Sequence, residues 1–200
     1  MPERADATTV RLWNRDDDAE TSRLSELLTH YHRATESEKA QWAATEPCEK
    51  TGVHRHYVDA TPESHTVRNQ VRAARLPEAY RAEIDDPHRA FRTAAVLLAH
   101  APDTVVGCAV LADAGDGHRS EPPQLELKRL WVEPAARGHG AAAGLVRAAI
   151  ESAEHAEAVL RLSVWSWRDG AIRLYERLGF VVVASWDARP DLVCLERSPS

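Results

Sequence analysis

The sequence predicts an α/β (α+β) fold, in which a mixed, mostly antiparallel sheet is flanked by helices in one domain at residues 8–197. Two observations carry this prediction. The apolar runs at residues 93–100 and 104–112 are separated only by Ala-Pro-Asp, a short turn of the kind that joins antiparallel strands. An Ala-rich helical segment at residues 138–156 lies between two further apolar runs, which predicts a right-handed crossover within the same sheet.

The remaining elements follow from hydrophobic spacing. A short strand is expected at residues 9–13, and the next segment begins with three acids and carries leucines on one helical face. Residues 32–90 have a weak, polar pattern, with helical spacing only over 67–84. Glycine, proline and polar residues predict an exposed loop at 113–123. Further strands are expected at 125–132, 160–167, 180–184 and 192–196, and a helix that ends before Gly179 at 169–178.

Composition and charge exclude several classes of function. Of 200 residues, 44% are hydrophobic and 28% charged, which is ordinary for a globular protein. The formal net charge is −6 and the basic residues are dispersed, so no nucleic acid partner is expected. No window supplies the roughly 20 apolar residues that cross a bilayer, so no membrane association is expected.

The cysteines indicate a reducing compartment. Cys48, Cys108 and Cys194 are odd in number and widely spaced, and none has a second cysteine at the spacing of a metal or redox motif. The N-terminal residues also lack the apolar stretch of a secretory signal. A cytoplasmic protein with free thiols is therefore expected.

The most informative segment runs from an apolar strand through a glycine-containing turn into a helix. Unpaired N–H groups at a helix N-terminus, beside the positive end of the helix dipole, bind phosphates. Side chains at Gly138 or Gly140 would hold phosphate oxygens away from the backbone, and Arg137 adds positive charge to the same turn. The segment predicts a pyrophosphate site, although a plain helix start stays open as an alternative on these residues alone.

A dinucleotide-binding fold is a further alternative. Gly138-His139-Gly140 begins the G-x-G-x-x-G fingerprint, and Glu157 lies at about the distance expected for a ribose-binding acid. The third glycine is replaced by Ala143, however, and the connection from strand to glycine is longer than that motif requires. These departures disfavour the dinucleotide alternative.

Two motifs in the right order make the chain resemble the GNAT (N-acetyltransferase) superfamily. Residues 137–142 match the family's Arg/Gln-x-x-Gly-x-Gly/Ala pattern and follow a Val-x-Pro element at 132–134. Residues 171–180, AIRLYERLGF, look like the helix that ends in the family's Tyr-x-x-x-Gly-Phe. The resemblance covers roughly residues 93–197 and implies that the strands at 125–132 and 160–167 splay apart, with the pantetheine arm of acetyl-CoA between them.

The resemblance also implies where the acetyl donor, acetyl-CoA, is held, and it implies no metal. The thioester oxygen should be bound by a backbone N–H at the end of the splayed strand. Arg168 departs from the family pattern, since many relatives have Asn there, and it is expected to meet either a CoA phosphate or the acceptor. The expected cofactor contacts are Leu130, Trp131, Val132, Arg137, Gly138, His139, Gly140, Ala141, Ala142 and Arg168.

Two residues are the candidate catalytic groups for acetyl transfer to an amine. Glu126, on the strand before the turn, resembles the family's basic glutamate and would take a proton from the acceptor. A paired surface carboxylate is the equal alternative. Tyr175 resembles the family's general acid, which protonates the departing thiolate, and the alternative for it is a core tyrosine.

Aromatic and histidine side chains give two further hypotheses. Trp165 and Trp167 should share one strand face, where they either pack in the core or form an aromatic wall for the acceptor. His30 with His32 and His54 with His56 lack the i, i+4 spacing of a helical zinc site, so no metal is expected.

These observations favour an acetyl-CoA-dependent transferase acting on a small-molecule primary amine. A transferase acting on a protein or an aminoacyl-tRNA, and a non-catalytic acetyl-CoA sensor, are the alternatives. The acidic balance favours a cationic small molecule over tRNA, for which a basic face would be expected. A homodimer is compatible with all three.

Overall fold

The computed structural model describes residues 8–45, 76–114 and 122–199, and it contains one seven-stranded sheet of order β1-β2-β3-β4-β5-β7-β6. All neighbouring strands are antiparallel except β4 and β5. The predicted fold class is confirmed. The strands are β1 (Thr9–Leu12), β2 (Ala95–Ala101), β3 (Thr104–Asp113), β4 (Gln124–Val132), β5 (Val159–Trp165), β6 (Val181–Val183) and β7 (Leu192–Arg197).

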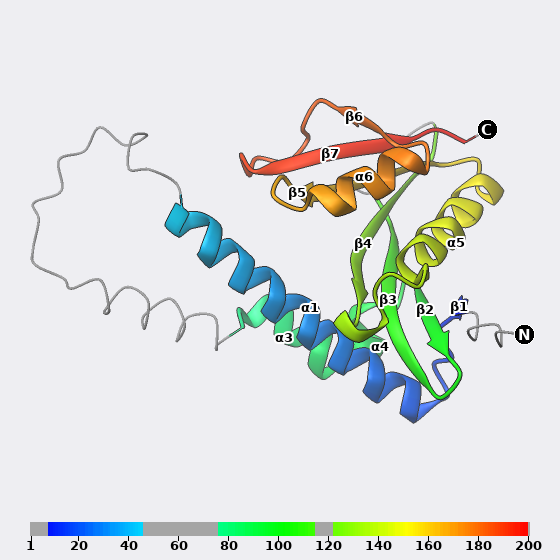
Figure 1. The fold of residues 1–200 in the computed structure, drawn as a ribbon. Helices are drawn as coiled ribbons and strands as arrows, with labels where there is room; N and C mark the ends of the chain where they lie inside the picture. Colours follow the sequence, from blue (N-terminus) through cyan, green and yellow to red (C-terminus); the bar gives the residue numbers. More distant parts are fainter. Residues whose placement is uncertain (1–7, 46–75, 115–121, 200) are drawn as a thin grey trace, which may run out of the picture.

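The helices lie on both faces of this sheet (Figure 1). One face packs against α1, with α3 and α4 alongside α1, and the other packs against α5 and α6. No helix in the described ranges is long and apolar enough to span a bilayer. The helices are α1 (Asp18–Thr45), α3 (Glu78–Asp85), α4 (Pro87–Ala90), the short 3₁₀ helix η1 (Pro134–Ala136), α5 (Ala141–His155) and α6 (Asp169–Arg177).

Two hydrophobic cores explain why the central strands read as continuous apolar runs. In β2, Leu97 and Ala99 belong to the core beneath α5, whereas Val96 and Leu98 belong to the core beneath α1. Successive strand residues point to opposite faces, so a sheet covered on both faces needs apolar side chains at every position.

The central strands β4 and β5 are paired over a short stretch only. Their ladder joins Gln124–Glu126 to Val159–Arg161, which is three residue pairs. Beyond Glu126 and Arg161, β4 runs on to Val132 and β5 to Trp165 with no further pairing between them. The predicted splaying of these strands is therefore confirmed, and in Figure 1 the two strands diverge from their paired end.

A bulge bends β4 just beyond the paired stretch. Cys108 faces Trp131 and Val110 faces Lys128, so the single residue Ala109 opposes both Arg129 and Leu130. Arg129 takes a positive φ of 55°, which is uncommon for a residue with a side chain. Such a bulge re-aims neighbouring side chains, and here it lies at the mouth of the split between β4 and β5.

Two boundaries differ from the sequence prediction. Helix α1 continues to Thr45, well past the apolar stripe that ends at Tyr31, because its C-terminal half is held by polar and aromatic contacts such as Glu38 with Arg168 and Trp42 with Trp167. Strand β5 ends at Trp165, so Trp167 lies in the following turn. Hydrophobic spacing does not detect the contacts of Glu38 or Trp42 that extend α1, because both join segments far apart in the sequence.

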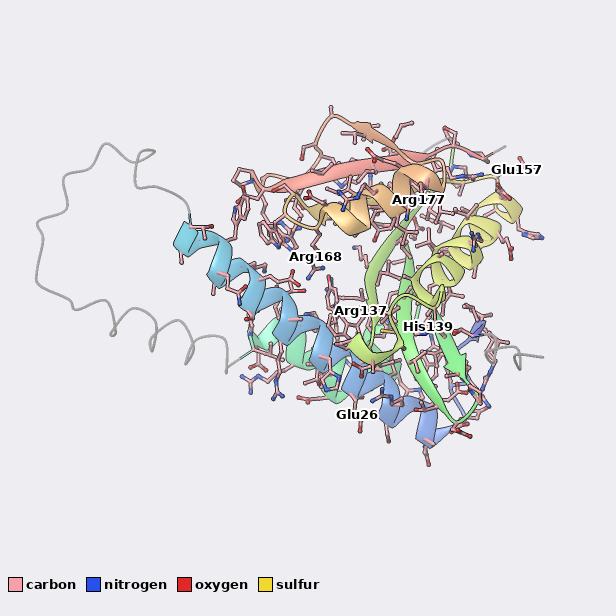
Figure 2. All side chains as sticks on the ribbon, in the orientation of Figure 1. Glu26, Arg137, His139, Glu157, Arg168 and Arg177 are labelled. Atoms are coloured by element: carbon pink, nitrogen blue, oxygen red, sulfur yellow. The ribbon has the colours of Figure 1, made fainter. Side chains whose placement is uncertain are left out.

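The helix after the glycine turn starts later than expected, and its position rules out the dinucleotide alternative. Helix α5 begins at Ala141, because Gly138 and Gly140 have φ values of 83° and 87° that a right-handed helix does not use. Glu157 follows the far end of α5 and precedes β5. Figure 2 shows it at the opposite end of the helix from Arg137 and His139, so it is not part of the glycine turn.

We expect Gly107→Ala to destabilise the fold by about 1–3 kcal/mol, because overpacking next to backbone cannot be relieved by a rotamer change. An added Cβ would lie 2.7 Å from the carbonyl oxygen of Trp131 in β4. Urea unfolding measures the loss. Gly170→Ala, where nothing lies within 4 Å of the added Cβ, is the control and should unfold at or slightly above the wild-type midpoint, because alanine favours the helix. Equal midpoints for both variants would contradict the close approach of β3 to β4.

Candidate active site

The split between β4 and β5 opens into a cleft of about 330 Å³. Its lining comes from both strands, from α6, and from Tyr31 of α1 and Tyr80 of α3. The cleft therefore begins where strand pairing stops and is closed on its outer side by α1 and α3. The predicted residues Glu126, Leu130, Arg168 and Tyr175 all lie in this lining.

A second cavity, of about 300 Å³, lies at the glycine turn that precedes α5. An added Cβ at Gly138 or Gly140 would meet nothing within 4 Å, so both glycines face open space. Six of the predicted cofactor contacts line this cavity, which places backbone amides and the N-terminus of α5 around one space. They are Val132, Arg137, Gly138, Gly140, Ala141 and Ala142.

Arg137 is held at the edge of this second cavity. Its Nε donates to the carbonyl oxygen of Val132 at 3.0 Å, and its guanidinium lies 4.8 Å from the centre of the Trp131 ring. Val132 is thus tied to the turn through a carbonyl that β5 does not use. The other predicted contacts lie elsewhere, since Trp131 is buried in the core beneath α1 and His139 is exposed outside the cavity lining.

Helix α6 separates the two cavities. Gly170, Leu174 and Arg177 face the glycine turn, whereas Ala171 and Tyr175 face the cleft. Spacings of four and three residues keep the first set on one side of the helix. Arg177 was not predicted from the sequence. Its position seven residues after Gly170 places both on one side of α6, and this spacing could have identified it. Figure 2 shows it at the end of α6 nearest α5.

Tyr175 lies at the inner end of the cleft. The residue is 94% buried, and its ring packs edge-on against Phe180 with centroids 5.8 Å apart. Burial raises the pKa of the Tyr175 phenol well above its ordinary value, Tyr31 adds to the rise, and the Arg168 guanidinium offsets part of it. The phenol is therefore protonated throughout the neutral range and available as a proton donor.

Glu126 lies at the last paired position of β4. Its Oε2 forms an ion pair with Lys128 Nζ at 3.0 Å. Lys128 is two residues further along β4 and therefore lies on the same strand face. The Oε1 of Glu126 has no hydrogen-bond donor among the residues that the structure describes. One carboxylate oxygen thus stays available to a molecule in the cleft.

Arg168 does not point toward the glycine turn. Its Nε donates to Glu38 at 2.7 Å and its Nη2 to Thr35 at 2.9 Å, so α1 holds it within the cleft. In Figure 2 it lies between α6 and α1, away from Arg137 and Arg177. Of the two expected partners for Arg168, this placement favours the acceptor over a CoA phosphate.

Arg129, at the bulge, is held by a network behind the cleft wall. Its Nε and Nη2 donate to the two oxygens of Glu83 at 2.7 and 2.6 Å, and His32 Nε2 lies 3.1 Å from the same carboxylate. Burial alone would raise the pKa of Glu83, but the hydrogen bonds from Arg129 and His32 lower it to about 2. The bidentate pair fixes the bulge against α3.

Aromatic rings continue the cleft wall outward. Trp165 stacks on Trp167 with centroids 4.8 Å apart, and Trp167 stacks on Trp42 of α1 at 5.1 Å. Trp165 and Tyr80 line the cleft. Neither Trp165 nor Trp167 belongs to the buried core. The rings thus form a ladder between the cleft and α1.

The histidines predicted not to bind metal have other partners where they are described. His30 pairs with Glu133 at 2.8 Å and His32 with Glu83 at 3.1 Å. Within the described ranges, no three or more His, Cys, Asp or Glu side chains are grouped as metal ligands. His54 and His56 lie outside those ranges.

We expect Glu83→Gln to lower the unfolding free energy by about 2 kcal/mol at pH 6, because the variant leaves the buried Arg129 without a charged partner. Since the folded-state pKa is about 2, below the unfolded value near 4.5, the contribution is complete above pH 4.5 and is lost as pH falls toward 2. Urea unfolding of both proteins across this window tests the change. Glu78→Gln, at an exposed α3 ion pair with Arg81, is the control. Its difference from wild type in unfolding free energy should not shrink as pH falls.

Solved structures with the same fold cover nearly the whole chain. An acetyltransferase of the GNAT family from Staphylococcus aureus Mu50 has 12% identity and a TM-score of 0.59, covering 97% of this chain and 100% of its own. A structure described as histone acetyltransferase HPA2 and related acetyltransferase, from Corynebacterium glutamicum, has 18% identity and a TM-score of 0.58, covering 97% of each chain. A proposed acetyltransferase from Salmonella typhimurium, solved with its cofactor acetyl-CoA, has 19% identity and a TM-score of 0.55, covering 96% of this chain and 94% of its own. Comparison with curated proteins gives no match.

The sequence itself matches a family profile over most of its length. The profile of the acetyltransferase (GNAT) family aligns with residues 22–180, which include the glycine turn, α6 and all of the cleft lining except Arg189 and Leu192. The chain therefore belongs to the GNAT acetyltransferase family.

Proposed function

We propose that this protein is an acetyl-CoA-dependent N-acetyltransferase that acts directly on the primary amine of a small molecule. One observation carries the proposal: a cavity at a glycine turn and a cleft containing Glu126 and Tyr175 lie on the two sides of one short helix, α6. A donor with a diphosphate at one end and a thioester at the other could reach from one space to the other.

The glycine turn has the chemistry to hold the diphosphate. Backbone N–H groups at the start of α5 have no helical partners and lie at the positive end of the helix dipole. Arg137 and Arg177 add positive charge from opposite sides of the same cavity. The Salmonella protein was solved with acetyl-CoA as its cofactor, which supports acetyl-CoA as the donor proposed here.

The proposed reaction joins the amine nitrogen to the acetyl carbon and breaks the bond from that carbon to sulfur. At neutral pH about one alkyl amine in a thousand is unprotonated, so a base that removes its proton increases the rate. We assign this role to Glu126, whose Oε1 faces no other donor within the described residues. A backbone N–H in the bulged stretch at Leu130–Val132 would stabilise the negative charge that develops on the thioester oxygen.

The departing sulfur requires a proton. Tyr175 can supply it, because burial keeps its phenol protonated, and it lines the cleft on the α6 side. A protonated amine loses two protons on becoming an amide: Glu126 passes one to solvent, and the other offsets the proton that Tyr175 gives to the sulfur. The cycle therefore releases one proton and needs no other reactant than the amine and the thioester.

Release of free thiol from acetyl-CoA, measured across a panel of primary amines, tests the proposal. We expect release above the rate without acceptor for at least one amine, with an equal amount of N-acetyl product. Release that no amine accelerates, combined with tight acetyl-CoA binding, would instead indicate a sensor.

We expect Tyr175→Phe to lower kcat by about 100-fold or more, the usual contribution of a general acid. The substitution keeps the ring and its packing against Phe180, so the dissociation constant for acetyl-CoA should not change. Stopped-time thiol assays and calorimetry give the two quantities. A kcat at the wild-type level would exclude Tyr175 as the proton donor.

We expect Arg177→Gln to weaken acetyl-CoA binding about 10-fold, as is typical for the loss of one charge-assisted contact to phosphate. Arg173→Gln removes the same charge from an exposed position of α6 outside the cavity lining and serves as the matched control. Calorimetry with both variants decides the point, and equal affinities would place the diphosphate elsewhere.

A further inference from the structure

We propose that the amine acceptor also carries a carboxylate, so that the substrate is a small amino acid rather than a polyamine. This inference rests on the proposed function and adds the chemical class of its acceptor. The observation behind it is the composition of the cleft between β4 and β5.

The charged lining of the cleft is mostly basic. Among the described residues, its side chains include Lys128, Arg129, Arg168 and Arg189, with Glu126 as the single acid. A cationic acceptor with several amines would meet four basic side chains on entering, each of which already has one carboxylate partner. The formal charge of the whole chain is −6, so this lining is opposite in sign to the rest of the protein.

The acids that pair with the three arginines are not part of the lining. Glu83 contacts Arg129 from α3, Glu38 contacts Arg168 from α1, and Asp187 contacts Arg189 from its own loop. Each carboxylate fixes a guanidinium through Nε and, for Arg129 and Arg189, also through Nη2. The arginines are thereby oriented in advance, which lowers the entropy lost when they bind an anion.

Arg168 and Arg189 keep hydrogen-bond donors for a ligand. A guanidinium has five N–H groups, and in both residues only Nε and Nη2 have acceptors among the residues that the structure describes. The Nη1 group of each is therefore unused. Two such groups in one cleft can bind the two oxygens of a carboxylate.

Tyr31 brings the basic groups from the two sides of the split together. The guanidiniums of Arg129 on β4 and Arg168 at the start of α6 lie 5.8 and 5.9 Å from its ring centre. Arg189 lies over Trp165 at 5.4 Å, on the β5 side of the same cleft. The anion site thus lies at the α1 side of the cleft, whereas Glu126 lies at its paired end, where the acceptor amine would lose its proton.

The test compares α-, β- and γ-amino acids with their amides, and with spermidine, as acceptors for acetyl-CoA-dependent thiol release. We expect wild-type protein to use at least one amino acid with a kcat/KM about 10- to 100-fold above that of its amide, the range of a charged hydrogen bond. The amide has the more readily deprotonated amine, so amine basicity alone would favour the opposite order.

Three variants separate the carboxylate contact from other effects. Arg168→Gln and Arg189→Gln should each lower the ratio of acid to amide about 10-fold or more, mainly through KM for the acid. Arg189 is on an exposed loop, so its variant remains informative if Arg168→Gln unfolds through loss of its contacts to α1. Arg147→Gln, on the exposed side of α5, removes the same charge and should leave the ratio unchanged.

The outcomes distinguish this inference from the function on which it rests. Transfer to amides or spermidine at rates equal to or above those of the acids overturns the carboxylate site but keeps the transferase. Unchanged ratios in both arginine variants also overturn it. Thiol release that no amine accelerates overturns both proposals.

Discussion

The constraint on which the site depends is the short pairing of β4 with β5. Only three residue pairs join these strands, although both continue beyond them. A parallel ladder running to Val132 and Trp165 would occupy the peptide groups and side-chain space that the cleft now offers. The bulge at Arg129 and Leu130 bends β4 within this stretch, and α1 and α3 cover the open side with Tyr31 and Tyr80. Separation of the strands thus creates both the space and its unpaired backbone.

The sequence predicts much of this arrangement because the conformation of a glycine and the spacing of apolar residues depend on residues close by in the sequence. Positive φ values favour glycine at positions 138 and 140, and Gly179 follows the end of α6 with a φ of 87°. Tyr175 and Glu126 were found through the spacing of family motifs, and both line the cleft. Their catalytic roles stay predictions, since placement does not measure proton transfer.

The parts that were not predicted depend on contacts between distant segments. Glu38 of α1 meets Arg168 across 130 positions of sequence, and Glu83 meets Arg129 across 46. Neither pair leaves a periodic signal, because a polar residue on a helix face reads as solvent-exposed until its partner is known. The same reason explains why the second half of α1 was missed. Net charge has the same limit, since the sum over the chain does not record that Glu38 and Glu83 contact arginines of the cleft from outside its lining.

The position of α6 shows how one short helix can serve two ligands at once. Consecutive helical residues are rotated by about 100°, so Gly170 and Ala171, or Leu174 and Tyr175, face different cavities while sharing one backbone. A shift of α6 by one residue would bring Leu174 into the cleft in place of the phenol. The register of α6 is set by its buried ring at Tyr175, which packs on Phe180, and by Gly179 at its end. The residue proposed to donate the proton therefore also fixes the helix that separates the donor cavity from the acceptor cleft.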